Sequence, residues 1–165
     1  MIRLTTVAEE RLRNSGWYPG RNIFDDLALS DHKELFDESI KLLGEFGLLK
    51  VPFKGKTQNE EEILYFDVDE SIASKTLRAK MFGFESHNNL MLKNEPDFIE
   101  TEDYELIDKV ISAINEPCTR IATKEDALGF DIYVTFNGSI YIAHHDVAEK
   151  RADSFYEYLN KIIVG

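Results

Sequence analysis

The stretch Ser15–Arg21, with the sequence Ser-Gly-Trp-Tyr-Pro-Gly-Arg, constrains the fold of this chain more than any other. It contains the only tryptophan of the 165 residues, close to two glycines and a proline. Gly16 follows a helical pattern and suits a helix end, while Pro19-Gly20 is typical of a tight turn. We therefore predict that Trp17 is buried and that a carboxylate or backbone carbonyls hold the guanidinium of Arg21. A ligand-gripping loop is the alternative interpretation.

The composition indicates one globular domain over residues 1–165. Its 43% hydrophobic and 30% charged residues are ordinary for a soluble protein. No apolar run reaches the roughly 18 residues of a membrane span. The first residues turn polar at once and lack an apolar segment, so we expect no signal peptide. A single cysteine, Cys118, has no partner for a disulfide and cannot by itself hold zinc. We expect a cytoplasmic protein without a metal or another cofactor.

The net charge of −12 is unevenly distributed along the sequence. Residues 1–21 hold four of the nineteen basic and two of the thirty-one acidic residues, which leaves a balance of −14 for residues 22–165. Such a charge repels nucleic acid and anionic membranes, and it speeds the encounter with basic partners. The alternative is that the charge serves solubility alone.

Apolar periodicity predicts alternating helices and strands without a repeat or linker. Helices are predicted at residues 6–14, 31–46, 71–82, 106–114 and 152–162. The first should turn Val7, Ala8 and Leu12 toward the core, and the second should be capped near Asp31. Strands are predicted at residues 48–53, 63–68, 118–123, 130–136 and 139–143. Residues 83–94 have no clear pattern and are expected to form a loop.

The strongest hairpin signal covers Phe130–Ala143, with Asn137-Gly138 at its centre. Asn-Gly suits a two-residue type I′ turn. Such a turn places Thr135 opposite Ile140 and Val134 opposite Tyr141. Both faces of the hairpin would then be largely apolar, so we expect other elements to cover at least part of each.

Few residues suggest catalysis. His144-His145-Asp146 is the one cluster suited to metal or acid–base chemistry, yet adjacent residues at a strand end point in opposite directions. Cys118 is expected to be a small buried thiol rather than a nucleophile. No phosphate-binding loop, Gly-x-Ser-x-Gly elbow or His-Glu-x-x-His motif is present. An enzyme is disfavoured, and a small hydrolase that uses the three residues of this cluster is a minor alternative.

A segment at residues 95–108 has seven acidic residues and no basic one. Aromatic side chains surrounded by acidic residues suit a basic partner, because the rings supply affinity and the negative charge raises the association rate. We predict that this segment binds a partner through Asp97, Phe98, Glu100, Glu102, Asp103, Tyr104 and Glu105. The alternative is a solvated helix start whose aromatic rings turn inward.

Five landmarks together resemble the third subfamily of the SUKH superfamily. Gly16-Trp17-Tyr18-Pro19-Gly20-Arg21 is similar to the Gly-Trp-x-Pro-Gly-Arg signature of that subfamily. Glu45-Phe46-Gly47-Leu48 resembles its Phe-Gly-Gly-Leu turn, with one glycine missing. Tyr65-Phe66-Asp67, Gly138-Ser139-Ile140-Tyr141 and the closing helix fit the family's order. The chain departs from it at Ile121-Ala122, where relatives carry a Pro-x-Gly element, and between residues 83 and 108.

This resemblance implies an α+β fold, in which helices flank a mixed, largely antiparallel sheet. Proteins of the family are bacterial immunity proteins that bind and silence polymorphic toxins, many of them nucleases or deaminases, without catalysis of their own. Together with the charge, this predicts a monomer that neutralises a basic toxin domain through an acidic surface. A non-catalytic adaptor with several weak partners is the alternative.

Overall fold

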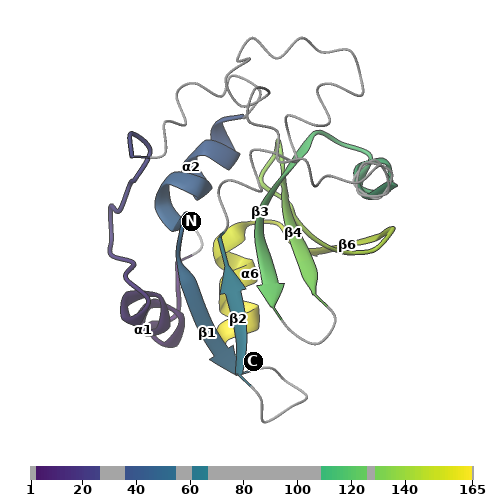
Figure 1. Cartoon of the computed structure of the whole chain (residues 1–165). Coiled ribbons are helices and arrows are strands. Elements are labelled where there is room, and N and C mark those ends of the chain that lie inside the picture. Colours follow the sequence, from purple (N-terminus) through teal and green to yellow (C-terminus); the bar gives the residue numbers. More distant parts are fainter. Residues whose placement is uncertain (1–2, 27–35, 55–60, 67–108, 126–128, 165) are drawn as a thin grey trace, which may run out of the picture.

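In the part of the chain that the structure describes, six strands form one sheet, and every pair of neighbouring strands is antiparallel (Figure 1). The computed structural model describes residues 3–26, 36–54, 61–66, 109–125 and 129–164. The strands follow chain order across the sheet: β1 (Lys50–Lys54), β2 (Glu61–Tyr65), β3 (Cys118–Glu125), β4 (Phe130–Thr135), β5 (Ile140–His144) and β6 (Val147–Ala152). With the helices that pack on it, this sheet makes the α+β fold that the family resemblance implies.

The predicted antiparallel pairing of the first two strands is confirmed. Pro52 of β1 lies opposite Ile63 of β2. Proline has no backbone N–H to donate, so it is tolerated in an edge strand, which is the position of β1.

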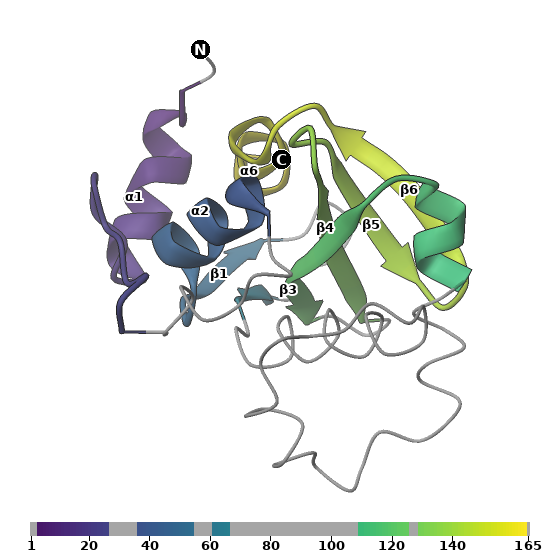
Figure 2. The ribbon, with the colours of Figure 1, turned by 90° about the horizontal axis from the view of Figure 1, so that it is seen from above.

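Three helices, α1 (Thr6–Asn14), α2 (Asp37–Phe46) and α6 (Phe155–Val164), gather on one side of the sheet (Figure 2). The bounds of α1 agree with the sequence prediction, and the hydroxyl of Thr5 caps the helix by accepting from the backbone N–H of Ala8 at 3.2 Å. Val7 was expected to face the core but is 48% exposed. Ala8 and Leu12, four residues apart, form the buried stripe instead.

Helix α2 begins later and ends differently from the sequence prediction. Its N-cap is Phe36, in extended conformation and without a side-chain cap, whereas the expected cap Asp31 lies outside the described residues. Gly47 follows the helix with φ −46°, and the left-handed conformation falls on Leu48, with φ 65°. The turn after α2 therefore places a leucine where glycine is the residue best suited.

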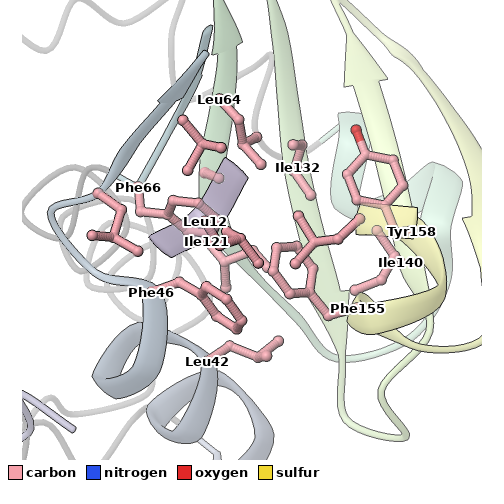
Figure 3. Close-up of a cluster of buried hydrophobic side chains, with 14 of the residues drawn as sticks. Leu12, Leu42, Phe46, Leu64, Phe66, Ile121, Ile132, Ile140, Phe155 and Tyr158 are labelled. Carbon is pink, nitrogen blue, oxygen red and sulfur yellow. The ribbon is translucent and has the colours of Figure 1, made fainter. Parts of the chain in front are cut away.

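In the main core, the ring of Phe46, at the end of α2, contacts several other aromatic rings (Figure 3). Its ring centroid lies 5.1 Å from Phe155, 5.5 Å from Phe66 and 6.5 Å from Trp17. Aromatic pairs at such distances contribute about 0.5–1.5 kcal/mol beyond the burial of their area. One ring thus joins α2 to α6, to the residue after β2, and to the turn after α1.

A second, smaller core lies on the opposite face of the sheet. Residues 109–114 are helical and bury Val110, Ile111 and Ile114 against Cys118, Tyr133 and Ala143. This agrees with the amphipathic helix predicted at 106–114, as far as that helix is described. It also confirms that both faces of the Phe130–Ala143 hairpin are covered in part, since α6 packs on the other face.

The predicted register of this hairpin is wrong by one residue. Val134 lies opposite Ile140, not opposite Tyr141. The loop has three residues, because the N–H of Thr135 donates to Ser139 O and Gly138 N–H donates to Thr135 O, both at 2.9 Å. Gly138 takes φ 88° as a glycine bulge residue, while Asn137 has no positive φ. As a result, Ile132, Val134 and Ile140 share one buried face.

Strand β6 was missed by the sequence prediction, which assigned no element between residues 143 and 152. The last helix was predicted from residue 152 but begins at Phe155, and Ala152 is the last residue of β6. The segment Glu149-Lys150-Arg151 lacks the apolar alternation of a strand because it lies at an edge and is exposed. The helix predicted at 71–82 and the loop predicted at 83–94 lie outside the described residues. Among the helices that are described, none is long and apolar enough to cross a membrane.

Candidate functional site

The residues predicted to bind a partner, Asp97, Phe98, Glu100, Glu102, Asp103, Tyr104 and Glu105, lie outside the described residues. The structure does describe the opening motif, the histidine pair and the buried cysteine.

The opening motif is a helix stop followed by a tight turn, as predicted. Gly16 has φ 97°, and Trp17 is 7% exposed. The backbone N–H of Arg21 donates to Tyr18 O at 3.0 Å, and Gly20 between them has φ 79°. This is the geometry of a type II turn, with proline at its second position and glycine at its third. The motif is therefore locally rigid.

The side chains of the motif are held by the C-terminal end of α2. Arg21 donates from Nη1 to the carbonyl of Glu45 at 2.6 Å and from Nη2 to the carbonyl of Gly47 at 2.9 Å. These carbonyls belong to the end of a helix, where they have no partner within the helix and carry partial negative charge. Burial lowers the pKa of Arg21, but a guanidinium remains charged. Arg21 thus acts as a C-terminal cap for α2.

Glu45 joins the motif to the last helix. Its Oε1 accepts from the indole N–H of Trp17 at 3.1 Å and from the hydroxyl of Tyr156 at 2.8 Å. Burial, with the hydrogen bond to Glu45, raises the pKa of Tyr156 above its ordinary value. We call Trp17, Arg21, Glu45 and Tyr156 the brace. Neither Glu45 nor Tyr156 was predicted to belong to a site, because a glutamate and a tyrosine within helical patterns do not signal a distant hydrogen-bond partner.

The brace explains the opening motif as a structural element. The guanidinium of Arg21 and the indole N–H of Trp17 both donate to protein acceptors, which leaves them unsuited to grip a ligand. This favours the structural interpretation of the motif over a ligand-gripping loop.

The two adjacent histidines lie closer together than the sequence analysis expected. Their ring centroids are 4.1 Å apart, because His145 occupies the turn after β5 with φ 52° and does not continue the strand alternation. Nδ1 of His144 lies 3.0 Å from the carbonyl oxygen of Gly129. Asp146 is exposed beside the pair. Within the described ranges, no three His, Cys, Asp or Glu side chains are placed to hold a metal ion.

Two other polar or reactive side chains are buried in the sheet. Cys118 is 2% exposed in the smaller core, as expected for a structural thiol. Arg120 is 3% exposed and donates from Nε to Asp131 at 2.7 Å, with the hydroxyl of Thr123 as a further partner. Its position next to the bulge in β3 was not predicted, since an arginine in a strand pattern is usually read as exposed.

The fold and the brace define a small α+β protein whose signature residues serve structure. The sequence pattern of the SUKH-3 immunity protein family matches residues 4–165, so the chain belongs to this family. The match covers the opening motif and every described element, which confirms the resemblance drawn from the five landmarks. Neither the curated proteins nor the solved structures contain a match to this chain.

Proposed function

We propose that this protein is a non-catalytic inhibitor that binds one toxin domain in the cytoplasm and blocks its active site or substrate groove. Membership of the SUKH-3 immunity protein family carries this proposal, because it implies a toxin-neutralising role and a protein partner. The toxin is a basic domain, of the nuclease or deaminase type common among targets of such proteins. The complex has one copy of each protein.

The charge of the chain supports a basic partner. The net charge is −12, and residues 22–165 alone carry −14. A basic toxin domain is steered toward such a protein, so the association rate should fall as salt is added. We place the centre of the contact at Glu95–Glu105, on the sequence argument that aromatic residues there lie within the densest acidic run.

The test is neutralisation of the toxin domain encoded beside this gene. Cells that express the toxin domain alone should stop growing, and co-expression of this protein should restore growth. The two purified proteins should form a one-to-one complex whose formation abolishes toxin activity. A His144→Ala, His145→Ala variant should protect equally well, which separates inhibition from hydrolysis by this cluster. Failure of the wild-type protein to bind the toxin domain at micromolar concentration would count against the proposal.

A further inference from the structure

The tip of the hairpin between β4 and β5 exposes most of an aromatic side chain. Phe136 is 70% exposed, the largest fraction for any bulky apolar side chain in the described residues. Exposed apolar area of this size is unfavourable in water. A phenylalanine held at a hairpin tip is therefore a candidate anchor for another molecule.

The backbone around Phe136 is fixed before any partner arrives. Its N–H donates to Pro117 O at 2.9 Å, and the glycine bulge closes the loop behind it. The side-chain oxygen of Asn137 accepts from the hydroxyl of Thr135 at 2.6 Å, which ties the loop to the last residue of β4. A rigid loop loses little conformational entropy when its ring is buried by a partner, so binding through it is efficient.

A second ring, from Phe36 at the N-cap of α2, supports the first. Phe36 lies edge to face with Phe136, with ring centroids 6.1 Å apart and an angle of 67° between planes. Phe36 is half-buried and packs against the main core. The pair therefore presents one anchored ring and one exposed ring, contributed by elements distant in sequence.

Negative charge borders this aromatic pair. A Cβ on Gly138 would lie 3.9 Å from Cγ of Glu38, so the Glu38 side chain runs beside the hairpin tip. Its carboxylate is 3.7 Å from Nζ of the exposed Lys41. A single ion pair at the surface contributes little, so a cation of a partner can replace Lys41 beside this carboxylate. Asp37, in the same first turn of α2, is exposed.

We propose that this hairpin surface, made of Phe36, Asp37, Glu38 and Phe136, docks an arginine-bearing segment of the toxin. A planar guanidinium can stack on the exposed ring of Phe136 and pair with the carboxylate of Glu38 at the same time. Lysine satisfies the charge but not the planar stacking. The inference rests on the proposed function and adds to it a contact site for the toxin that is made of described residues.

The first experiment removes the exposed ring. Phe136→Ser should weaken binding of the toxin domain encoded beside this gene at least about tenfold, mainly through faster dissociation. Tyr18→Ser is the matched control, because Tyr18 is 55% exposed and belongs to the opening turn. The control should bind within about twofold of the wild type, the scatter expected outside a hot spot. Melting curves check that both variants remain folded.

The second experiment tests the basic occupant. Glu38→Lys should slow association at least about threefold at low salt, more than Glu10→Lys, an exposed change of equal charge on α1. An equal effect of the two reversals would overturn the assignment of an arginine-bearing segment.

The outcomes separate this inference from the proposed function. A wild-type protein that does not bind the toxin domain overturns both. If the wild type binds the toxin domain and Phe136→Ser binds with an affinity within twofold of the wild type, only the proposal of the hairpin surface is overturned. An equal loss in Tyr18→Ser also overturns it, because the effect then does not belong to the hairpin.

Discussion

The hydroxyl of Tyr156 lies 2.8 Å and 2.9 Å from the two carboxylate oxygens of Glu45, which ties the last helix to the end of α2. The two residues are 111 positions apart in sequence. Because Trp17 donates to the same carboxylate, the side chain of Glu45 connects three parts of the fold: α2, α6 and the turn that follows α1. Breaking this connection should therefore lower the free energy of unfolding more than it alters the shape of the surface.

The first prediction concerns the alkaline stability of this contact. Burial, reinforced by the hydrogen bond to Glu45, raises the pKa of Tyr156 above its ordinary 10.0. The stabilisation is then complete below the unfolded-state pKa and is lost as pH rises through the folded-state pKa. The difference in unfolding free energy between wild type and Tyr156→Phe should be larger at neutral pH than at about pH 11. Urea unfolding at both pH values measures it, and a difference that grows with pH would contradict the assignment.

The second prediction concerns Trp17. Trp17→Ala should destabilise the protein by about 3–5 kcal/mol, as for other buried large-to-small changes. Trp17→Phe keeps a ring against Phe46 but removes the donor to Glu45, and should cost about 1–3 kcal/mol. Far-ultraviolet circular dichroism in urea measures both variants without the tryptophan signal. Equal costs for the two would show that the hydrogen bond, not the packing, dominates.

Local sequence patterns predicted most of the described elements, although not β6, but they did not predict the side-chain contacts of the brace. The bounds of α1, the amphipathic character of 109–114 and the position of Gly16 follow from spacing alone. The brace does not, because Glu45 and Tyr156 look like ordinary helical surface residues until the fold places them together. Burial of Arg120 was hidden for the same reason. Only tertiary packing distinguishes such residues from exposed ones.

The hairpin register shows a different limit. Asn-Gly suits a two-residue turn, but it also suits the last two positions of the observed three-residue loop. The apolar pattern contained the answer, since only the observed register places Ile132, Val134 and Ile140 on one face. The requirement that the apolar residues of both strands share one face was thus a better guide to the register than the turn preference of Asn-Gly.

The third prediction follows from the turn after α2. Leu48 has φ 65° and is 55% exposed, so its side chain gains little from burial while its Cβ strains the backbone. Leu48→Gly should stabilise the protein by about 0.5–1 kcal/mol, after allowing for the added entropy of the unfolded chain. Leu48→Ala keeps the Cβ and should give no such gain. Thermal unfolding compares the three proteins, and a gain for alanine equal to that for glycine would contradict the strain.

The fourth prediction tests the hairpin loop. Gly138 has φ 88°, and a Cβ placed there would meet nothing closer than 3.9 Å. The cost of substitution therefore comes from the backbone conformation and not from a clash. Gly138→Ala should cost about 1–2 kcal/mol and Gly138→Val more, because a branched Cβ tolerates positive φ least. Chemical denaturation measures both, and a neutral valine variant would be incompatible with the observed loop.

The last prediction concerns the acidic segment proposed to attract the toxin. Glu100→Lys, Glu102→Lys and Glu105→Lys together should slow association with the toxin domain about tenfold or more, within the range of electrostatic steering. The effect should shrink as salt is added, because screening shortens the reach of the charges. Dissociation should change less, since short-range packing sets it.

The matched control reverses three exposed acidic residues elsewhere, Glu10, Asp146 and Glu149, and so raises the net charge by the same amount. If the acidic segment lies in the interface, the control slows association much less than the first triple variant, because steering depends on charges near the contact. Stopped-flow kinetics at low and high salt compare the two. Equal slowing would mean that net charge alone matters, and an unchanged rate in the first variant would move the interface to another part of the surface.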